Sequence, residues 1–445
     1  MTQSISSSFM GLARLHAAAK GNSQLQFNNL MHHITVKMLA KAYSCLNRKA
    51  AKGIDDEDWY SYGNNLPTKL KDLAQRLHNN RYLPQAVKRI WIPKDNGQER
   101  PLGITTIEDK IVQQALVWVL ESIYENDFLG FSYGFRPKRN QHQALDAVYM
   151  VITAKKVSWI LDADIRGFFD NINHDWMMKF MKHRVSDPRV LRVIKLILKA
   201  GVMDQGCKTK TVVGTPQGAV ISPLLGNIYL HYVLDLWVEQ WRKSKTQGEV
   251  YVIRYADDTV FCYQYKTDAR RYLVALGQRL NKFNLELNHE KTKLIEFGRF
   301  AEQNRKERGK SKARTFDFLG FTHICSRQRS TNGFALKRKT IAKRQRLKLK
   351  SIQNKLKKSY HDCPVKIGKW LSVVVQGYYN YYAAPGNSMI LDRFRTDVIH
   401  MWIKSMRRRN QKGKSVPWRK FNRLIETFVP KVRVLHPYPS ERLCV

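Results

Sequence analysis

Four aspartates stand in two segments that otherwise have the composition of β-strands, in a chain that is basic overall. Asp162 and Asp164 lie in VSWILDADI, and Asp257 and Asp258 lie between the β-rich runs EVYVIRY and TVFCYQY. A buried carboxylate without a partner is costly, so acids in such surroundings need an explanation. Carboxylates gathered from two strands suit a hard cation such as Mg²⁺, which prefers oxygen ligands and keeps places for water and phosphate.

Two such ions roughly 3.5–4 Å apart would activate a 3′-hydroxyl, stabilise a leaving pyrophosphate and clamp an in-line displacement. Two simpler explanations stay open at this point. Asp is a common turn residue, so Asp257–Asp258 could be an ordinary acidic turn. Asp162 or Asp164 could equally pair with a neighbouring arginine. The spacing and the flanking residues must decide between these alternatives.

The elements that would position these acids follow from the periodicity of the chain. Residues 10–90 predict helices with short breaks, because apolar positions recur every three or four residues. VKRIWIPK followed by DNG predicts a hairpin. The segment VSWILDADI predicts a strand that enters a loop at Gly167, and Asp257–Asp258 fall at the turn of a second hairpin. Residues 90–325 therefore predict a mixed α+β region.

The charge of the chain restricts its partners. There are 78 Lys+Arg against 36 Asp+Glu, a formal net charge of +42, and 43% of the residues are hydrophobic. That much apolar material predicts a folded protein, and the basicity predicts a polyanionic partner. Nucleic acid is the expected partner, with an anionic membrane surface as the alternative. No run of about 18 apolar residues and no signal peptide is present, so we expect a cytoplasmic, nucleoid-associated protein without a membrane anchor.

The last third of the chain is more basic still. Between Lys337 and Lys358 eleven of twenty-two residues are Lys or Arg and none is acidic, which predicts one basic amphipathic helix. The cluster GYYNYYAAPG follows, and its tyrosines either stack on unpaired bases or pack between helices. We place boundaries near residues 326 and 400.

The motifs together resemble a known family. YADD at Tyr255–Asp258 is similar to the active-site hairpin of reverse transcriptases, LDADIRGFFDNINHD to their first catalytic motif, and GTPQGAVISPLLGNIYL to their Q-G-x-x-x-S-P block. FSYGFRPKRNQHQAL, LNHEKTK and FDFLGF follow the order of the family, and GYYNYY resembles its maturase region. The chain resembles most the reverse transcriptase/maturases encoded by bacterial group II introns.

This resemblance implies a catalytic and metal-binding set. Asp164 is preferred to Asp162, because the family has an aromatic residue five positions after its catalytic aspartate and Phe169 meets that requirement. Two Mg²⁺ ions, with Mn²⁺ as a substitute, are the implied cofactors. The implied catalytic and metal ligands are Asp164, Asp257 and Asp258, with the backbone carbonyl of Ile165 as a further metal ligand.

The resemblance also implies contacts to substrates. The predicted nucleotide-binding residues are Lys94, Arg100, Phe169, Gln217, Gly218 and Lys291. For Lys94 and Arg100 a solvated basic loop is the alternative, and for Lys291 a solvated turn lysine. The predicted nucleic-acid-binding residues are Arg136, Arg139, Lys337, Arg338, Lys343, Arg344, Arg346, Arg407, Arg408 and Arg409.

The implied fold is α+β, a right-hand polymerase with fingers, palm and helical thumb plus a small basic C-terminal module. We divide it into a helical N-terminal extension with the start of the fingers (1–90), a fingers/palm core (91–325), a thumb similar to the maturase X domain (326–400) and a basic nucleic-acid-binding region (401–445). Two departures from the family pattern are expected to matter. We expect no C-terminal endonuclease module with paired cysteines and histidines, and Asp56 in KGIDDEDW stands where the resemblance implies Gly.

The predicted function is that of an RNA-directed DNA polymerase that binds group II intron RNA, assists its splicing and copies it into cDNA during retrohoming. Its predicted partners are intron RNA, an RNA template with a DNA primer, target DNA and deoxynucleoside triphosphates, and the sequence does not indicate an oligomeric state. Two alternatives stay open. One is a domesticated relative in DNA repair or phage defence, and the other is a maturase that binds RNA for splicing without polymerising.

Overall fold

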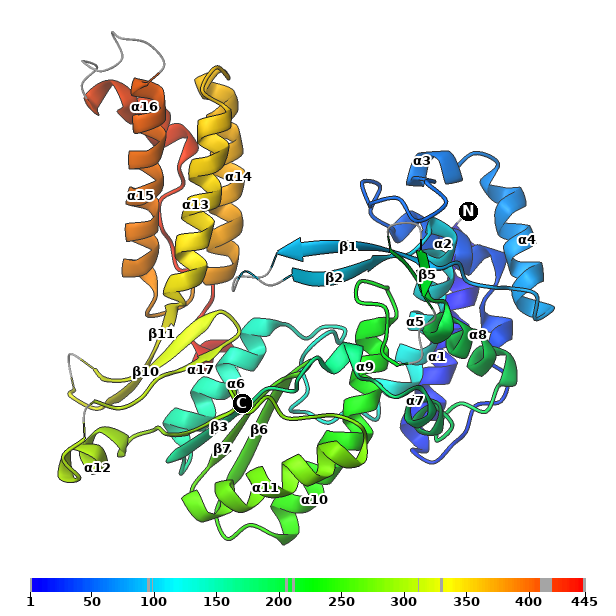
Figure 1. Cartoon of the computed structure of the whole chain (residues 1–445), viewed down its shortest axis with the longest axis horizontal. Helices are drawn as coiled ribbons and strands as arrows, with labels where there is room; N and C mark the ends of the chain where they lie inside the picture. The colour runs from blue at the N-terminus through cyan, green and yellow to red at the C-terminus, as the bar shows by residue number, and fades with distance from the viewer. Residues whose placement is uncertain are drawn as a thin grey trace.

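The chain folds into an α+β structure made of a helical N-terminal body, a central sheet and a long helical bundle (Figure 1). The computed structural model describes residues 2–93, 97, 99–204, 207–209, 213–310, 312–328, 331–408 and 418–442. No helix in these ranges is long and apolar enough to cross a membrane.

The N-terminal body is mainly helical, as the periodicity predicts. Helices α1 and α2 both pack on α5, whose residues are buried on nearly every side. Asp56 adopts a φ of 51°, the left-handed conformation that Gly takes most readily. The elements of the body are α1 (Thr2–Gly21), η1 (Met31–His33), α2 (Val36–Cys45), α3 (Trp59–Tyr62), α4 (Leu66–His78), α5 (Ile107–Tyr124), α7 (His174–Met181) and α8 (Pro188–Lys199).

A four-stranded sheet of order β2-β1-β4-β5 extends from this body toward the helical bundle (Figure 1). Its strands β1 (Val87–Pro93) and β2 (Glu99–Ile104) form the hairpin that VKRIWIPK and the DNG turn predict. The short strands β4 (Val202–Asp204) and β5 (Cys207–Thr209) complete it.

The central sheet carries the acids and has the order β6-β7-β3-β8, with every pair antiparallel. Both faces are buried. Leu161 and Phe261 belong to the hydrophobic core of the N-terminal half, whereas Ile160 and Val260 belong to the core shared with the bundle. The strands are β3 (Trp159–Ala163), β6 (Val250–Tyr255), β7 (Asp258–Tyr263) and β8 (Lys293–Glu296).

Helices cover the two faces of this sheet. Helix α6 (Gln141–Ala154) contacts β6 and joins the core shared with the bundle. The other elements next to the sheet are η2 (Phe168–Asp170), α9 (Ser222–Leu230), η3 (His231–Asp235), α10 (Leu236–Ser244), α11 (Lys266–Lys282) and α12 (Ala301–Glu307).

The predicted basic helix at 337–358 is wrong at its start. Lys337–Thr340 belongs to β11 (Phe334–Thr340), which pairs along its length with β10 (Phe321–Arg327) in a sheet completed by β9 (Phe316–Phe318). The helix α13 begins at Ala342 and ends at Lys358. The predicted boundary at 326 therefore falls inside β10, and the one at 400 falls inside α15 (Ser388–Arg407).

Three long helices, α13, α14 (Pro364–Tyr382) and α15, form the bundle (Figure 1). Tyr378, Tyr379 and Tyr382 are buried in it, so these tyrosines pack between helices, as one of the two explanations predicts. After η5 (Trp418–Phe421) and α16 (Asn422–Phe428) the chain returns along the bundle. Its last helix, α17 (Pro439–Arg442), contacts α6, and Arg442 pairs with Asp146 there.

Candidate active site

Strand register brings the predicted catalytic acids together. β3 and β7 pair from Trp159–Tyr263 to Ala163–Thr259, so the next two residues along these strands, Asp164 and Asp258, are neighbours across the sheet edge. Opposite residues of antiparallel strands have Cα atoms roughly 4.5–5.5 Å apart. Asp257 lies in the adjoining turn between β6 and β7, because Tyr255 pairs directly with Asp258. The two motifs therefore converge as the sequence predicts.

The turn that carries Asp257 is held in an unusual backbone conformation. Ala256 has a φ of 56°, a region that residues with a side chain rarely adopt and that persists only where surrounding contacts enforce it. One such contact is with Gly134, where an added Cβ would lie 2.3 Å from the Ala256 nitrogen. Glycine at 134 thus lets the neighbouring loop close against the turn.

Arg254 supplies the second constraint. Its side chain is completely buried and forms an ion pair with the equally buried Asp235. The guanidinium also donates to the Ala256 carbonyl at 2.9 Å, to Asn227 Oδ1 at 3.0 Å and to Ser132 Oγ at 2.7 Å. The arginine before YADD is therefore a positioning residue that ties the catalytic turn to η3, α9 and the 130–134 loop. Sequence reasoning missed this role, although the arginine belongs to the quoted motif.

Asp164 is held by a turn from another part of the chain. Its carbonyl accepts a hydrogen bond from the Asn288 amide at 2.8 Å, and its own amide donates to Thr292 Oγ1 at 3.4 Å. Lys291, from the same turn, places its Nζ 3.1 Å from Asp164 Oδ2. Lys291 therefore forms an ion pair with a predicted metal ligand although its side chain is 67% exposed, and its contact with a nucleotide stays a prediction.

Three of the four acids have raised pKa values. Burial, together with the charge of Asp164, raises the pKa of Asp257. Burial and the charges of Asp257 and Asp164 raise the pKa of Asp258 to about 6. Asp162, on the same face of β3, has its pKa raised to about 7 by burial and then by Asp258 and Asp164. Such mutual repulsion favours the binding of a cation.

Cations from two other elements face the acids as well. Arg100 of β2 acts electrostatically on Asp257 and lowers its pKa, in opposition to burial. Arg344 of α13 acts in the same way on Asp258. The hairpin of the N-terminal half and the bundle thus both reach the edge of the central sheet that carries the carboxylates. A contact of Arg100 with a nucleotide stays a prediction, and Lys94 lies outside the described residues.

The residues fit a divalent metal in donor chemistry. Asp164, Asp257 and Asp258 offer hard carboxylate oxygens at one edge. Within the described residues, however, no three His, Cys, Asp or Glu side chains are grouped closely enough to hold an ion as they stand. Ile165, whose carbonyl is the further predicted ligand, has a buried side chain and bridges to Leu287.

Gln217, one of the predicted nucleotide-binding residues, lines a hollow. A pocket of about 340 Å³ is lined by Leu102, Asp170 and Gln217, among others. The Gln217 side chain donates to Asp170 Oδ1 at 2.6 Å, which fixes its amide at the wall of the pocket. Phe169 packs against α9, where a Cβ added at Gly226 would lie 2.9 Å from its ring.

Gly218 is required by the fold. Its φ is 104°, and an added Cβ would lie 2.8 Å from the Gly103 carbonyl of β2. Because Gly218 has no side chain, its backbone can lie close to β2. A direct contact of Gly218 with a nucleotide stays a prediction.

Comparison with known proteins identifies the family of the chain. Residues 92–323, more than half of the chain, match the family model described as reverse transcriptase (RNA-dependent DNA polymerase). The chain belongs to the reverse transcriptases. Its enzymatic activity is that of an RNA-directed DNA polymerase, a class that generally uses divalent metal ions.

Similar proteins extend the match. Protein YkfC of Escherichia coli is 33% identical over 318 residues, which cover 63% of this chain and 83% of that protein. Group II intron-encoded protein LtrA of Lactococcus lactis is 41% identical over 181 residues, 40% of this chain and 30% of LtrA. An uncharacterized 91 kDa protein in the cob intron of Schizosaccharomyces pombe is 41% identical over 157 residues, 35% of this chain and 19% of that protein. The reverse transcriptase is thus homologous to intron-encoded proteins and spans under a third of LtrA.

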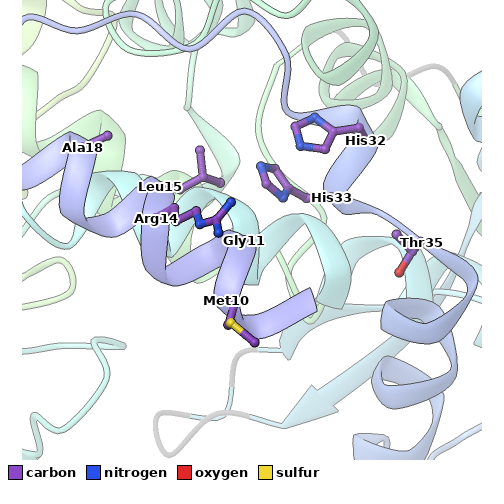
Figure 2. A pocket seen from close by; sticks show the side chains of 8 residues that line it. All are labelled: Met10, Gly11, Arg14, Leu15, Ala18, His32, His33 and Thr35. Atoms are coloured by element: carbon purple, nitrogen blue, oxygen red, sulfur yellow. The ribbon is translucent and has the colours of Figure 1, made fainter. Parts of the chain in front are cut away.

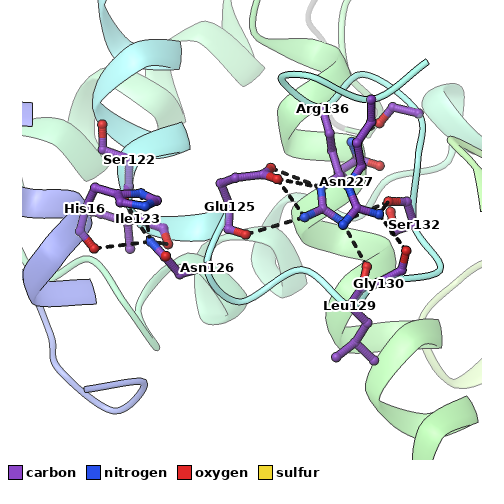
Figure 3. Close-up of polar contacts among 12 residues, drawn as sticks. His16, Ser122, Ile123, Glu125, Asn126, Leu129, Gly130, Ser132, Arg136 and Asn227 are labelled. Carbon is purple, nitrogen blue, oxygen red and sulfur yellow. Dashed lines mark hydrogen bonds and ion pairs between the residues drawn. The ribbon is translucent and has the colours of Figure 1, made fainter. Parts of the chain in front are cut away.

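Two predicted nucleic-acid contacts of the reverse transcriptase, those of Arg136 and Arg338, are corrected by burial. Figure 3 shows Arg136 turned inward, where its guanidinium pairs with Glu125 at 2.7 Å and bonds the Leu129 and Ser132 carbonyls. Arg139 donates to the Gly130 carbonyl at 2.5 Å. Both arginines fix the 129–132 loop. Arg136 is buried and cannot offer its charge to a template, whereas Arg139 is half-buried and its contact with a template stays a prediction.

Arg338 is buried in the same way. Its side chain is 2% exposed and pairs at 2.9 Å with Asp146 of α6, which is 3% exposed. A guanidinium in this position anchors β11 to α6 and cannot reach a nucleic-acid backbone, so the predicted contact at Arg338 is wrong. The reverse transcriptase uses it as an internal bridge.

Five of the other predicted nucleic-acid-binding residues are accessible to solvent. Lys337, Lys343, Arg344, Arg346 and Arg408 are exposed. Arg407 is partly buried, with its guanidinium 5.9 Å from the Phe421 ring centroid, and Arg409 lies outside the described residues.

A hollow that sequence reasoning did not find lies away from the strands. It has a volume of about 730 Å³ and is formed by α1 and the segment around η1 (Figure 2). His33 packs against Gly11 of α1, where an added Cβ would lie 2.9 Å from its Nδ1. Burial and then the neighbouring His32 lower the pKa of His33 to about 4, so this ring is neutral at physiological pH.

Proposed function

We propose that this reverse transcriptase copies group II intron RNA into cDNA by two-metal-ion nucleotidyl transfer and assists splicing of the same RNA. The observation that carries the chemistry is the register that makes Asp164 and Asp258 neighbours, with Asp257 in the adjoining turn. The observation that favours the intron as template is the similarity to LtrA, a group II intron-encoded protein.

In this proposal the central sheet with its helices is the palm, the N-terminal body with the β1–β2 hairpin is the fingers, and the α13–α15 bundle is the thumb. The positions of Arg100 and Arg344 support it, because both act on the acids from outside the central sheet. A primer–template held between these bodies would place its growing end over the carboxylates.

Each side chain has a role that follows from its chemistry. The three aspartates would hold two Mg²⁺ ions, which supply charge stabilisation for the attacking and leaving oxygens. Arg100 offers a planar fork of donors suited to a triphosphate. Phe169, which packs against α9, would exclude a 2′-hydroxyl and thereby favour deoxynucleotides. Gln217 lines the pocket next to it.

The decisive experiment is Mg²⁺-dependent extension of a DNA primer on an RNA template by the wild type and Asp257→Asn. Loss of one metal ligand removes several kcal/mol of transition-state stabilisation, so we expect synthesis to fall by about 10³-fold or more. Asp162→Asn is the matched control. It makes the same change at an acid that interacts with Asp164 and Asp258 but lies outside the predicted ligand set. It should retain most of the synthesis. Equal synthesis by the Asp257→Asn variant would refute the mechanism.

The choice of template needs its own test. We expect group II intron RNA to bind more tightly than an unrelated structured RNA of the same length at several salt concentrations, and its splicing to be faster with the protein present. Equal affinity without an effect on splicing would favour the alternative in DNA repair or phage defence. Splicing assistance by a chain that synthesises no cDNA would favour the splicing-only alternative.

A further inference from the structure

Lys291 forms an ion pair with Asp164, a predicted metal ligand. Its ammonium lies 3.1 Å from Asp164 Oδ2, although the lysine side chain is 67% exposed and has open solvent available. The contact joins residues 127 positions apart in the chain, so sequence proximity does not explain it. Arg100 and Arg344 act on Asp257 and Asp258, whereas Lys291 is the cation that forms an ion pair with Asp164 among the described residues.

The surrounding backbone holds this lysine at its place. The Asn288 carbonyl accepts hydrogen bonds from the amides of Lys291 at 3.2 Å and Thr292 at 2.8 Å, which closes the turn. The same turn bonds the Asp164 carbonyl through the Asn288 amide and the Asp164 amide through Thr292 Oγ1. Main chain and side chain of Asp164 are thus held by one short segment, and Lys291 is the member that reaches the carboxylate.

An ammonium and a divalent ion compete for the same oxygen. A bound Mg²⁺ lies roughly 2.0–2.1 Å from a carboxylate oxygen and keeps a full shell of ligands, so it cannot share that oxygen with a hydrogen-bonded ammonium without strong repulsion. We propose that Lys291 is a cation placeholder: it pairs with the Asp164 carboxylate and orients it while no metal is bound, and a metal ion must displace it.

This role makes the affinity for the metal depend on whether substrate is bound. An anion that draws Lys291 away from Asp164 makes the carboxylate available, and by linkage the metal and the anion then strengthen each other's binding. A triphosphate entering beside Lys291 is such an anion. The inference rests on the proposed metal site at the three aspartates.

The test measures Mn²⁺ affinity of the full chain by the electron paramagnetic resonance signal of free Mn²⁺, without nucleotide or RNA. Exposed ion pairs are worth little, so Lys291→Met should tighten Mn²⁺ binding by about two- to fivefold. Lys291→Arg should weaken it, because the guanidinium fork holds a carboxylate more firmly. Melting curves without metal confirm that each variant is folded.

Lys293→Met is the matched control. Lys293 is exposed on β8 opposite Asp162, so its loss removes the same charge from the same sheet edge without an ion pair to Asp164. Equal tightening by both methionine variants, or no change in Lys291→Met, would overturn the placeholder role while leaving the metal site intact. If Mn²⁺ fails to bind the wild type and every variant, the proposed metal site itself fails.

Discussion

The catalytic edge of the central sheet and helix α13 of the bundle are both rich in charge, but their charges are arranged in opposite ways. At the sheet edge Arg254 and Asp235 are 0% exposed and pair with each other, and the arginine also bonds to Ala256, Asn227 and Ser132. Along α13 there are eight Lys and Arg residues, and none pairs with a carboxylate among the described residues. The helix buries only Ile352 and Leu356.

This difference separates two uses of charge. A buried ion pair is costly to desolvate and is tolerated where it fixes a geometry, here the turn that carries Asp257. An exposed row of like charges destabilises its own helix slightly and gains its value from a polyanion that covers it. We therefore expect changes at the sheet edge to affect folding and chemistry, and changes on α13 to affect binding alone.

The largest effect is expected at Arg254. Arg254→Met leaves Asp235 buried and unpaired, which should lower the free energy of unfolding by about 3–5 kcal/mol in urea titrations. Adding Asp235→Leu removes the lone charge and should restore most of that stability. DNA synthesis should stay low in the double variant, because the Ala256 carbonyl has still lost its donor. A double variant with normal synthesis would show that Arg254 serves stability only.

Two adjacent residues of β11 allow the same comparison within one strand. Arg338 is buried against Asp146, and Lys337 is exposed. Arg338→Gln should lower the free energy of unfolding by about 3 kcal/mol, because Asp146 then keeps only Arg442 as its partner. Lys337→Gln should change it by less than about 0.5 kcal/mol. Similar values for the two variants in urea titrations would contradict the division into buried and exposed charge.

Arg338 also shows where prediction from sequence stops. The buried positions of β11 are Leu336, Arg338 and Thr340, an alternation of two that is apolar at only one of them. An arginine becomes a buried residue only through a partner, and Asp146 is 192 positions away in the chain. The local sequence thus reads as the start of a basic helix.

The acids were predictable for the converse reason. Their strands are short β-rich runs with turn residues beside them, so local pattern defines both elements. The family resemblance then supplies the pairing of two motifs that the pattern alone leaves separate, and the register of β3 and β7 is consistent with it. The residues that hold the turn, among them Gly134 and Asp235, act through contacts between distant segments. No local sequence pattern predicts these contacts.

On α13, charge should control binding without affecting the fold. Lys343, Arg346 and Lys350 lie on one face of the helix and are exposed. Changing all three to Gln should leave the melting temperature unchanged and lower RNA affinity. The slope of log affinity against log salt should become shallower by about 2–3, since each phosphate contact contributes roughly 0.7–0.9. An unchanged slope would mean that this face does not contact the nucleic acid.

The smallest effect tests how closely a duplex approaches the bundle. Arg344, Lys348, Val373 and Gly377 line a hollow of about 570 Å³ between α13 and α14, where Val373 is 74% exposed. Gly377 lies inside α14, and a Cβ added there meets no protein atom within 4 Å, so nothing inside the protein requires glycine. Alanine should therefore stabilise the helix by up to about 1 kcal/mol.

Gly377→Ala should nevertheless weaken binding of an RNA–DNA duplex, because the added methyl group projects into the hollow next to two cations. A cost of about 0.5–1 kcal/mol corresponds to roughly two- to fivefold in affinity. Gly277→Ala in α11 is the matched control, since its Cβ would have only an ordinary contact of 3.8 Å with Leu287. Both variants should melt at a higher temperature, and only Gly377→Ala should lose affinity. Unchanged duplex binding by Gly377→Ala would place the duplex on another face of the bundle.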